Sequence, residues 1–142
     1  MAADEIRDPA VAAAFAAFHR PLAGQLRAVR RLILDTAATT DGVGRLVETV
    51  KWGQPAYLTV GPKSGSTIRL GEAPGLPGRG ALFVHCQTSL VETLRRHYPD
   101  GFTYLGSRAV VLPAEAPLPA AELAHMIALA LTYHRWKDRL AA

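Results

Sequence analysis

The sequence has little of several features that define common protein classes. Its 142 residues include a single cysteine, Cys86, so the chain cannot form an internal disulfide bond. One cysteine is typical of a reducing compartment, which predicts a cytoplasmic protein. No apolar run approaches the roughly 20 residues that a membrane-spanning helix requires, so we expect no membrane span. The alanine-rich stretch 10–17 follows Asp4, Glu5 and Asp8 rather than basic residues, which argues against a secretory signal.

Signatures of catalysis and of metal binding are missing from the sequence too. There is no G-x-S-x-G motif, no P-loop and no dinucleotide-binding fingerprint. The five histidines include no pair three or four residues apart, the spacing at which two imidazoles on a helix reach one zinc ion. We expect Cys86 to face the core with Leu82 and Val84, where a thiol is a poor nucleophile. The sequence therefore predicts no catalytic residue, no metal ligand and no cofactor, and it disfavours an enzyme.

The composition is that of a globular chain, with 49% hydrophobic and 20% charged residues. Its length predicts one domain over residues 1–142, with enough chain to bury a core of its own. The formal net charge of +4 suggests anionic partners, including nucleic acid. The basic residues are scattered over predicted helices, however, where solvated polar faces explain them better. Nucleic-acid binding is therefore a weak alternative.

Apolar periodicity and turn residues predict the secondary structure. In the second predicted helix, Leu22, Leu26, Val29 and Ile33 form one apolar stripe. The expected helices cover residues 9–19, 21–39, 43–50, 90–97 and 117–139, and the expected strands cover 57–60, 67–70, 81–86, 102–105 and 108–112. This order predicts an α+β fold, with a mostly antiparallel sheet of about five strands covered on one face by the N-terminal and C-terminal helices.

Alternation along the strands predicts a candidate ligand site on the other face of the sheet. The residues expected to face the helices are Leu58, Val60, Ile68, Leu70, Leu82 and Val84, which leaves Thr59 and most of the candidates below on the open face. Arg69 can hold a carboxylate or phosphate through two parallel hydrogen bonds, with Tyr57 and Phe83 as apolar walls. The predicted ligand-binding residues are Gln54, Tyr57, Thr67, Arg69, Phe83, His85 and Gln87, and the predicted ligand is a small anionic molecule. A solvated face or a homodimer interface is the alternative.

The segment Lys51-Trp52-Gly53-Gln54-Pro55, with Tyr57, resembles the W-G-x-P-x-Y signature of the YdhG-like domain family. The resemblance extends over nearly the whole chain, from the paired N-terminal helices to Ala130-Leu131-Thr132-Tyr133-His134. It implies a compact cytoplasmic α+β domain in a family whose members mostly lack an assigned activity. Some relatives are labelled intracellular iron chaperones, which would imply iron binding on an acidic surface. Within the signature we expect Trp52 to be buried where a helix meets the sheet, with Gly53 and Pro55 shaping the turn.

Taken together, these features favour a non-catalytic ligand-binding or protein-interaction module that uses the open sheet face around Arg69. The first alternative is a metal-handling protein of the iron chaperone type, for which the acidic cluster would be Asp4, Glu5 and Asp8. The second alternative is weak nucleic-acid binding.

Overall fold

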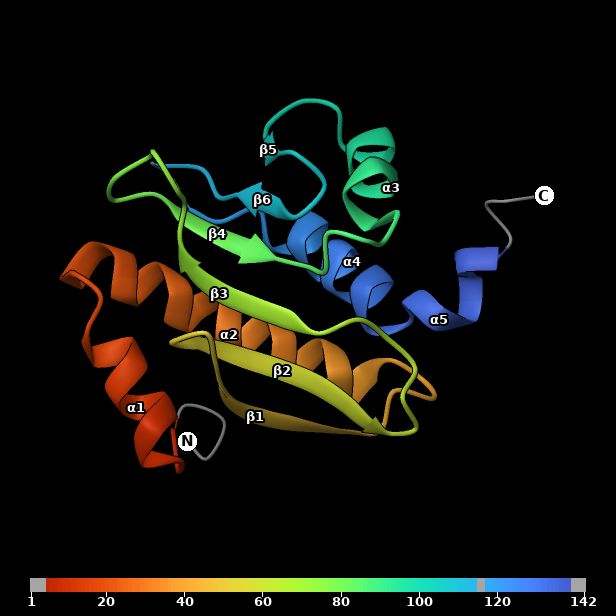
Figure 1. Ribbon diagram of the computed structural model, residues 1–142, viewed down its shortest axis with the longest axis horizontal. Coiled ribbons are helices and arrows are strands. Elements are labelled where there is room, and N and C mark those ends of the chain that lie inside the picture. Colours follow the sequence, from red (N-terminus) through yellow and green to blue (C-terminus); the bar gives the residue numbers. More distant parts are fainter. Residues whose placement is uncertain (1–4, 115–116, 139–142) are drawn as a thin grey trace.

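The computed structural model describes residues 5–114 and 117–138 (Figure 1). The elements in chain order are α1 (Pro9–Ala16), α2 (Arg20–Thr39), β1 (Arg45–Lys51), β2 (Gln54–Gly61), β3 (Ile68–Glu72), β4 (Gly80–Phe83), α3 (Leu90–His97), β5 (Thr103–Leu105), β6 (Ala109–Val111), α4 (Ala120–Leu131) and α5 (Tyr133–Trp136). None of the helices within these ranges is both long and apolar enough to cross a membrane.

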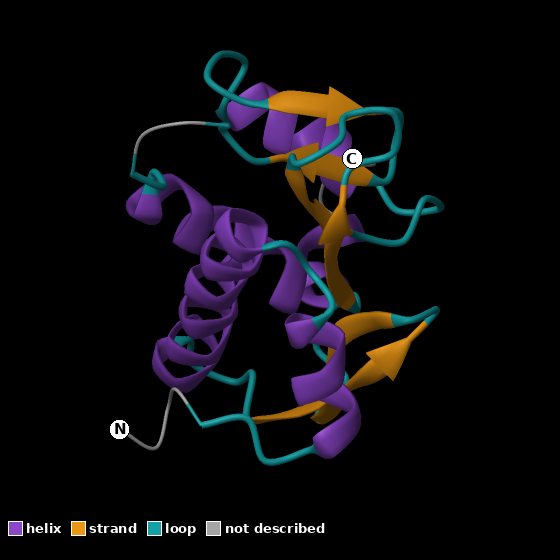
Figure 2. Cartoon of the chain, turned by 90° about the vertical axis from the view of Figure 1, so that its left-hand side faces the viewer, coloured by secondary structure: helices purple, strands orange, loops and turns teal. Residues whose placement is uncertain are grey.

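The strands form one open antiparallel sheet of six strands in the order β1-β2-β3-β4-β6-β5. Buried residues from all five helices join one core with a single face of this sheet. Figure 2 shows α2 lying to one side of the strands. A smaller cluster around Phe83 and Val111 lies on the opposite face. The expected α+β class and the antiparallel sheet covered on one face by helices are confirmed, with one strand more than expected.

Helix α2 supplies the central part of the core. Its apolar stripe of Leu22, Leu26, Val29 and Ile33 is buried, as the spacing of these residues predicts. A helix of this kind is held mainly by burying one face, because helix propensity alone stabilises a helix only weakly in water. The helix over 90–97 and the hairpin that turns at 106–107 also form where the sequence predicts them.

Strand β1 replaces the helix that the sequence predicts over residues 43–50. Val47, Thr49 and Val50 are β-branched, so they lose side-chain freedom in a helix and pack well on a pleated sheet. The strand pairs with β2 from Arg45, opposite Gly61, to Lys51, opposite Gln54. The prediction of a helix here is wrong because local β-propensity and this pairing both favour a strand.

The turn between β1 and β2 consists of Trp52 and Gly53. Both residues have positive φ, 56° at Trp52 and 74° at Gly53, as in the tight two-residue turns whose twist matches that of paired strands. At the tip of this hairpin none of the described elements covers Trp52, and 88% of its surface is exposed. The expectation that Trp52 is buried between helix and sheet is therefore wrong.

The predicted alternation holds for β3 and β4 and is reversed in β2. Ile68, Leu70, Leu82 and Val84 lie in the main core, as expected. Tyr57 lies opposite Ile68 on the neighbouring strand, and directly paired residues share a face, so Tyr57 is in the core as well. By the same alternation Leu58 and Val60 lie on the open face, while Thr59 points toward the helices and is buried. The prediction for β2 is wrong because the two-residue turn fixes a register that periodicity alone did not specify.

The loop before β3 interrupts the last helix, which the sequence predicts as continuous. The backbone N–H of Ser66 donates to the carbonyl of Ala130 at 2.9 Å, and the Ser64 hydroxyl donates to the carbonyl of Leu131 at 2.8 Å. A side chain at Gly65 would collide with the carbonyl of Leu131, so this close approach requires glycine. The helix therefore divides into α4 and α5 at Thr132. Arg139, at the expected helix end, lies outside the described residues.

Cys86, which the sequence predicts to face the core, is exposed. Strand β4 ends at Phe83, so the alternation that would bury Cys86 does not extend that far. The prediction is wrong because the strand that carries the pattern ends before this residue. His134 belongs to α5, which begins after the break at Thr132, and it is exposed as well.

Candidate functional site

Arg69 lies in β3 on the sheet face opposite the helices. Its Cα partners are Ala56 on β2 and Phe83 on β4. The Nη1 atom of Arg69 donates a hydrogen bond of 2.6 Å to Oε1 of Gln54. The guanidinium carbon lies 5.6 Å from the centroid of the Phe83 ring, within range of a cation–π interaction. These two contacts fix the position of the guanidinium on the sheet.

Gly71 leaves room for this arrangement. It lies two residues after Arg69 on β3, so any side chain there would point to the same face of the sheet. A Cβ atom on Gly71 would collide with the side-chain amide nitrogen of Gln54 and would lie 3.4 Å from the Phe83 ring. The missing side chain thus allows Gln54 to extend across the sheet and reach Arg69.

No carboxylate in the described ranges lies within ion-pair distance of Arg69. Burial lowers the pKa of the Arg69 guanidinium, and the nearby charge of Arg108 lowers it further. Arginine nevertheless remains protonated at ordinary pH. The lowered pKa therefore means that partial burial and repulsion by Arg108 make the charged form of Arg69 less favourable than it would be in water. An anion placed here would interact favourably with both arginines.

A hollow of about 180 Å³ opens beside Arg69. Its lining residues are Lys51, Trp52, Thr67, Arg69 and His85. The backbone N–H of Gln87 donates to Nδ1 of His85 at 3.0 Å, so a neutral His85 carries its proton on Nε2 and presents a donor. The side chains of Lys51, Trp52 and Arg69 also offer only donors, and the Thr67 hydroxyl can donate. A hollow lined by donors and positive charge suits an anionic group.

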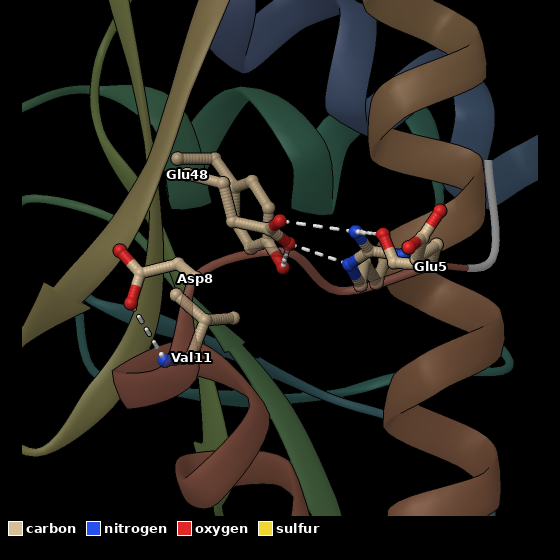
Figure 3. A network of polar contacts seen from close by, with 6 residues as sticks. Glu5, Asp8, Val11 and Glu48 are labelled. Carbon is tan, nitrogen blue, oxygen red and sulfur yellow. Dashed lines mark hydrogen bonds and ion pairs between the residues drawn. The ribbon is translucent and has the colours of Figure 1, made fainter. Parts of the chain in front are cut away.

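Tyr57 lies on the other side of the sheet, where its hydroxyl joins a polar network between α2 and the first two strands. Figure 3 shows Glu48 within this network. The Tyr57 hydroxyl donates to Oε2 of Glu48 at 2.7 Å. Nε and Nη2 of Arg30 donate to the two oxygens of the same carboxylate at 2.5 and 3.0 Å, and Nη2 also donates to the carbonyl of Glu5 at 3.1 Å. This network ties the N-terminal segment, a helix and two strands together.

The network holds both ionisable partners of Glu48 in their protonated states. Burial, followed by the hydrogen bond to Glu48, raises the pKa of Tyr57 far above its usual range. The hydrogen bond to Glu48 raises the pKa of Arg30 despite the opposing effect of burial. The charges of Arg30 and Glu48 balance each other within the fold, so this buried group is structural.

The structure brings together five of the residues predicted to bind a ligand. They are Gln54, Thr67, Arg69, Phe83 and His85. Gln87 contributes its backbone N–H to His85. Tyr57 is fully buried on the helical side of the sheet, so its predicted place at the site is wrong.

Sequence reasoning missed Lys51, Trp52 and Arg108. A signal for the first two was present, because Trp52-Gly53 lies between β-branched residues that end at Val50 and a β-rich run that begins at Tyr57. A pair of residues with glycine in the second position is typical of a hairpin turn. No comparable signal indicated Arg108, which the tertiary fold brings close to Arg69.

Metal ligands do not converge in the part of the chain that the structure describes, where no three His, Cys, Asp or Glu side chains could hold an ion. The rings of His97 and His125, from α3 and α4, have centroids 5.0 Å apart, and the Tyr98 hydroxyl lies 2.7 Å from Nδ1 of His125. Within the acidic cluster, Asp8 caps α1 and Asp4 lies outside the described residues. Iron handling therefore stays a prediction.

A larger hollow, of about 540 Å³, lies on the helical side of the molecule. Its walls include Arg27 and Leu32 of α2, together with Ile6 and Leu118. Ile6 and Leu118 each lie two residues from a segment outside the described ranges, so we assign no site to this hollow. The hollow beside Arg69 is smaller, and its lining residues are distant in the chain from those segments.

The chain matches no family model, no curated protein and no solved structure. Its resemblance to the YdhG-like domains stays a prediction from the W-G-x-P-x-Y segment.

Proposed function

We propose that this protein binds a small anionic molecule in the donor-lined hollow beside Arg69. The observation that carries the proposal is the state of Arg69 itself. Its guanidinium is held by Gln54 and Phe83, lies near Arg108, and has no carboxylate partner among the described residues. A ligand carboxylate or phosphate would supply the missing counter-charge.

The arrangement is suited to binding because Arg69 is ordered before any ligand arrives. Immobilising a flexible side chain costs roughly 0.5–1.5 kcal/mol on binding, and a side chain that is already fixed avoids much of this cost. Arg69 uses Nη1 in its hydrogen bond to Gln54. The other N–H groups of its planar guanidinium can donate hydrogen bonds to two oxygens of an anion. Lys51 and His85 add donors from neighbouring strands and loops.

We propose binding rather than catalysis. None of the described hydrogen bonds joins two residues of the lining, so no nucleophile there is paired with a base. The lining supplies positive charge, donors and one large aromatic surface. These are the elements of recognition.

Isothermal titration calorimetry with inorganic phosphate, sulfate and acetate tests the proposal. We expect at least one of these anions to bind, and Arg69→Gln to weaken that binding about 10- to 100-fold, since a hydrogen bond to a charged group contributes about 1.5–3 kcal/mol. Arg69→Lys should bind with intermediate affinity, because it keeps the charge but loses the planar fork.

Arg20→Gln is the matched control. It removes the same charge at the exposed first residue of α2, on the helical side of the sheet, so it should leave anion affinity unchanged. The proposal fails if none of the three anions binds at millimolar concentration, or if Arg20→Gln weakens binding as much as Arg69→Gln does.

A further inference from the structure

Trp52 is the most exposed large hydrophobic side chain of the described residues, and it lines the proposed anion site. Its ring, 88% exposed, contributes almost no buried apolar area to the fold. Its φ of 56° is also unfavourable for a residue with a Cβ, and Asn, Asp or Gly would suit the same turn better. Trp52 therefore costs stability where it stands, as residues that serve a binding site often do.

The charges around Trp52 restrict what can lie on its ring. The face of an indole attracts cations, but a cationic ligand would be repelled here by Lys51, Arg69 and Arg108. A planar ring attached to an anion satisfies both features, because it can stack on the indole while the anion meets the positive charges.

The size of the hollow places that ring outside it. A cavity of about 150 Å³ is filled by one benzene ring, so a hollow of about 180 Å³ has no room for a ring together with a phosphate or carboxylate group. The anionic group has to occupy the hollow to reach Arg69, which leaves the ring outside it. Trp52 stands at the border of this space with its surface open to solvent. A ring linked to the bound anion would thus lie on the exposed surface of Trp52.

We infer that the ligand is an aromatic anion, in which a phosphate or carboxylate group occupies the hollow beside Arg69 and a planar ring stacks on Trp52. The inference rests on the proposed anion site and adds the ring. Nucleoside monophosphates belong to this class, and phenyl phosphate is its simplest phosphate member.

Calorimetric titrations with matched pairs of probes test the ring separately from the anion. The pairs are inorganic phosphate against phenyl phosphate and adenosine monophosphate, and acetate against benzoate. We expect at least one ring-bearing compound to bind about 5- to 100-fold more tightly than its ring-free counterpart, the range found for stacking of a base on an aromatic side chain.

Trp52→Asn is the decisive variant, because asparagine suits the positive φ of the turn while it removes the ring. Trp52→Asn should abolish the ring-dependent gain, so that ring-bearing and ring-free anions bind this variant with similar affinity, and should keep or raise the urea midpoint. Trp52→Phe, which keeps an aromatic face, should retain part of the gain.

The outcomes separate this inference from the proposed function. If the simple anions bind but no ring-bearing compound binds more tightly, the inference is wrong and the anion site stands. A ring-dependent gain that persists in Trp52→Asn would also overturn it, since the ring would then not stack on Trp52. If no anion binds at all, the proposed function itself fails.

Discussion

Arg30 and Arg69 lie on opposite sides of the same sheet and differ in nearly every aspect of their surroundings. Arg30 is only 5% exposed and donates two hydrogen bonds to the carboxylate of Glu48. Arg69 is partly exposed and contacts an amide oxygen and an aromatic ring. The pKa of Arg30 is raised, chiefly by its hydrogen bond to Glu48, while that of Arg69 is lowered by burial and by Arg108.

The opposite directions of the two pKa shifts separate two uses of arginine. Where a carboxylate pairs with the guanidinium, the charge is balanced inside the fold and the ion pair holds elements together. Where burial and a second cation act on the guanidinium, no carboxylate among the described residues balances its charge. We therefore assign a structural role to Arg30 and propose a ligand-binding role for Arg69.

The largest expected effect compares Arg30→Met with Arg69→Met. Removing Arg30 leaves the Glu48 carboxylate partly buried without its counter-charge, so the free energy of unfolding should fall by about 3–5 kcal/mol. Arg69→Met leaves no carboxylate of the described residues unpaired and should cost less than about 1 kcal/mol. Urea denaturation of both variants measures the difference. Equal losses would show that the two arginines are not distinguished by their partners.

A smaller effect is expected for Tyr57→Phe, and it should depend on pH. At neutral pH the lost hydrogen bond to Glu48 should cost about 1.5 kcal/mol. The pKa of folded Tyr57 is raised, whereas in the unfolded chain it is about 10. Above about pH 10 the unfolded chain thus loses a proton that the folded protein keeps, and this group's contribution to stability falls by about 1.4 kcal/mol per pH unit.

Urea curves of the wild type and Tyr57→Phe at neutral pH and on both sides of pH 10 give this difference directly. The gap between the two proteins should be constant below about pH 10 and should close as the pH rises above it. A gap that does not change with pH would mean that the phenol is not held protonated by its burial.

The smallest expected effect concerns the contact between Gln54 and Arg69, which a change at Gly71 would disturb without altering Arg69 itself. Gly71→Ala would displace the flexible side chain of Gln54, and the backbone of a strand readily accepts alanine, so stability should change by less than about 1 kcal/mol. Arg69 would lose its amide partner, and anion affinity should fall several-fold. Gly24→Ala is the matched control, because a Cβ there has nothing within 4 Å beyond its chain neighbours and the backbone of its own helix. Unchanged affinity in Gly71→Ala would show that Gln54 does not position Arg69.

Local patterns predicted much of the fold. The apolar stripe of α2, the helix over 90–97 and the hairpin turning at 106–107 each follow from residues close together in the chain. The helix expected over 43–50 failed because a short run with mixed signals was decided by pairing with β2. The break between α4 and α5 could not be predicted, since it depends on Ser64 and Ser66 from a loop about 65 residues earlier.

The candidate site was predicted in part. Arg69 and Phe83 lie on the open face, as predicted, because β3 and β4 each follow a simple alternation. His85 lies beyond the end of β4 and lines the hollow from the loop that follows. Tyr57 was misplaced because an alternating strand looks the same from the sequence whichever of its faces is inward. Trp52 was expected to be buried because of its size, yet the turn it occupies lies beyond the edge of the core.

The amino-acid sequence by itself determined the α+β class, the stripe that buries α2 and the presence of an arginine on the open face of β3, because these depend on the local spacing of apolar and polar residues. Only the tertiary structure decided which arginine meets a carboxylate, which face of β2 is inward and which side chains surround Arg69. Those outcomes depend on the register between strands and on contacts between segments far apart in the chain, and local spacing does not encode either of them.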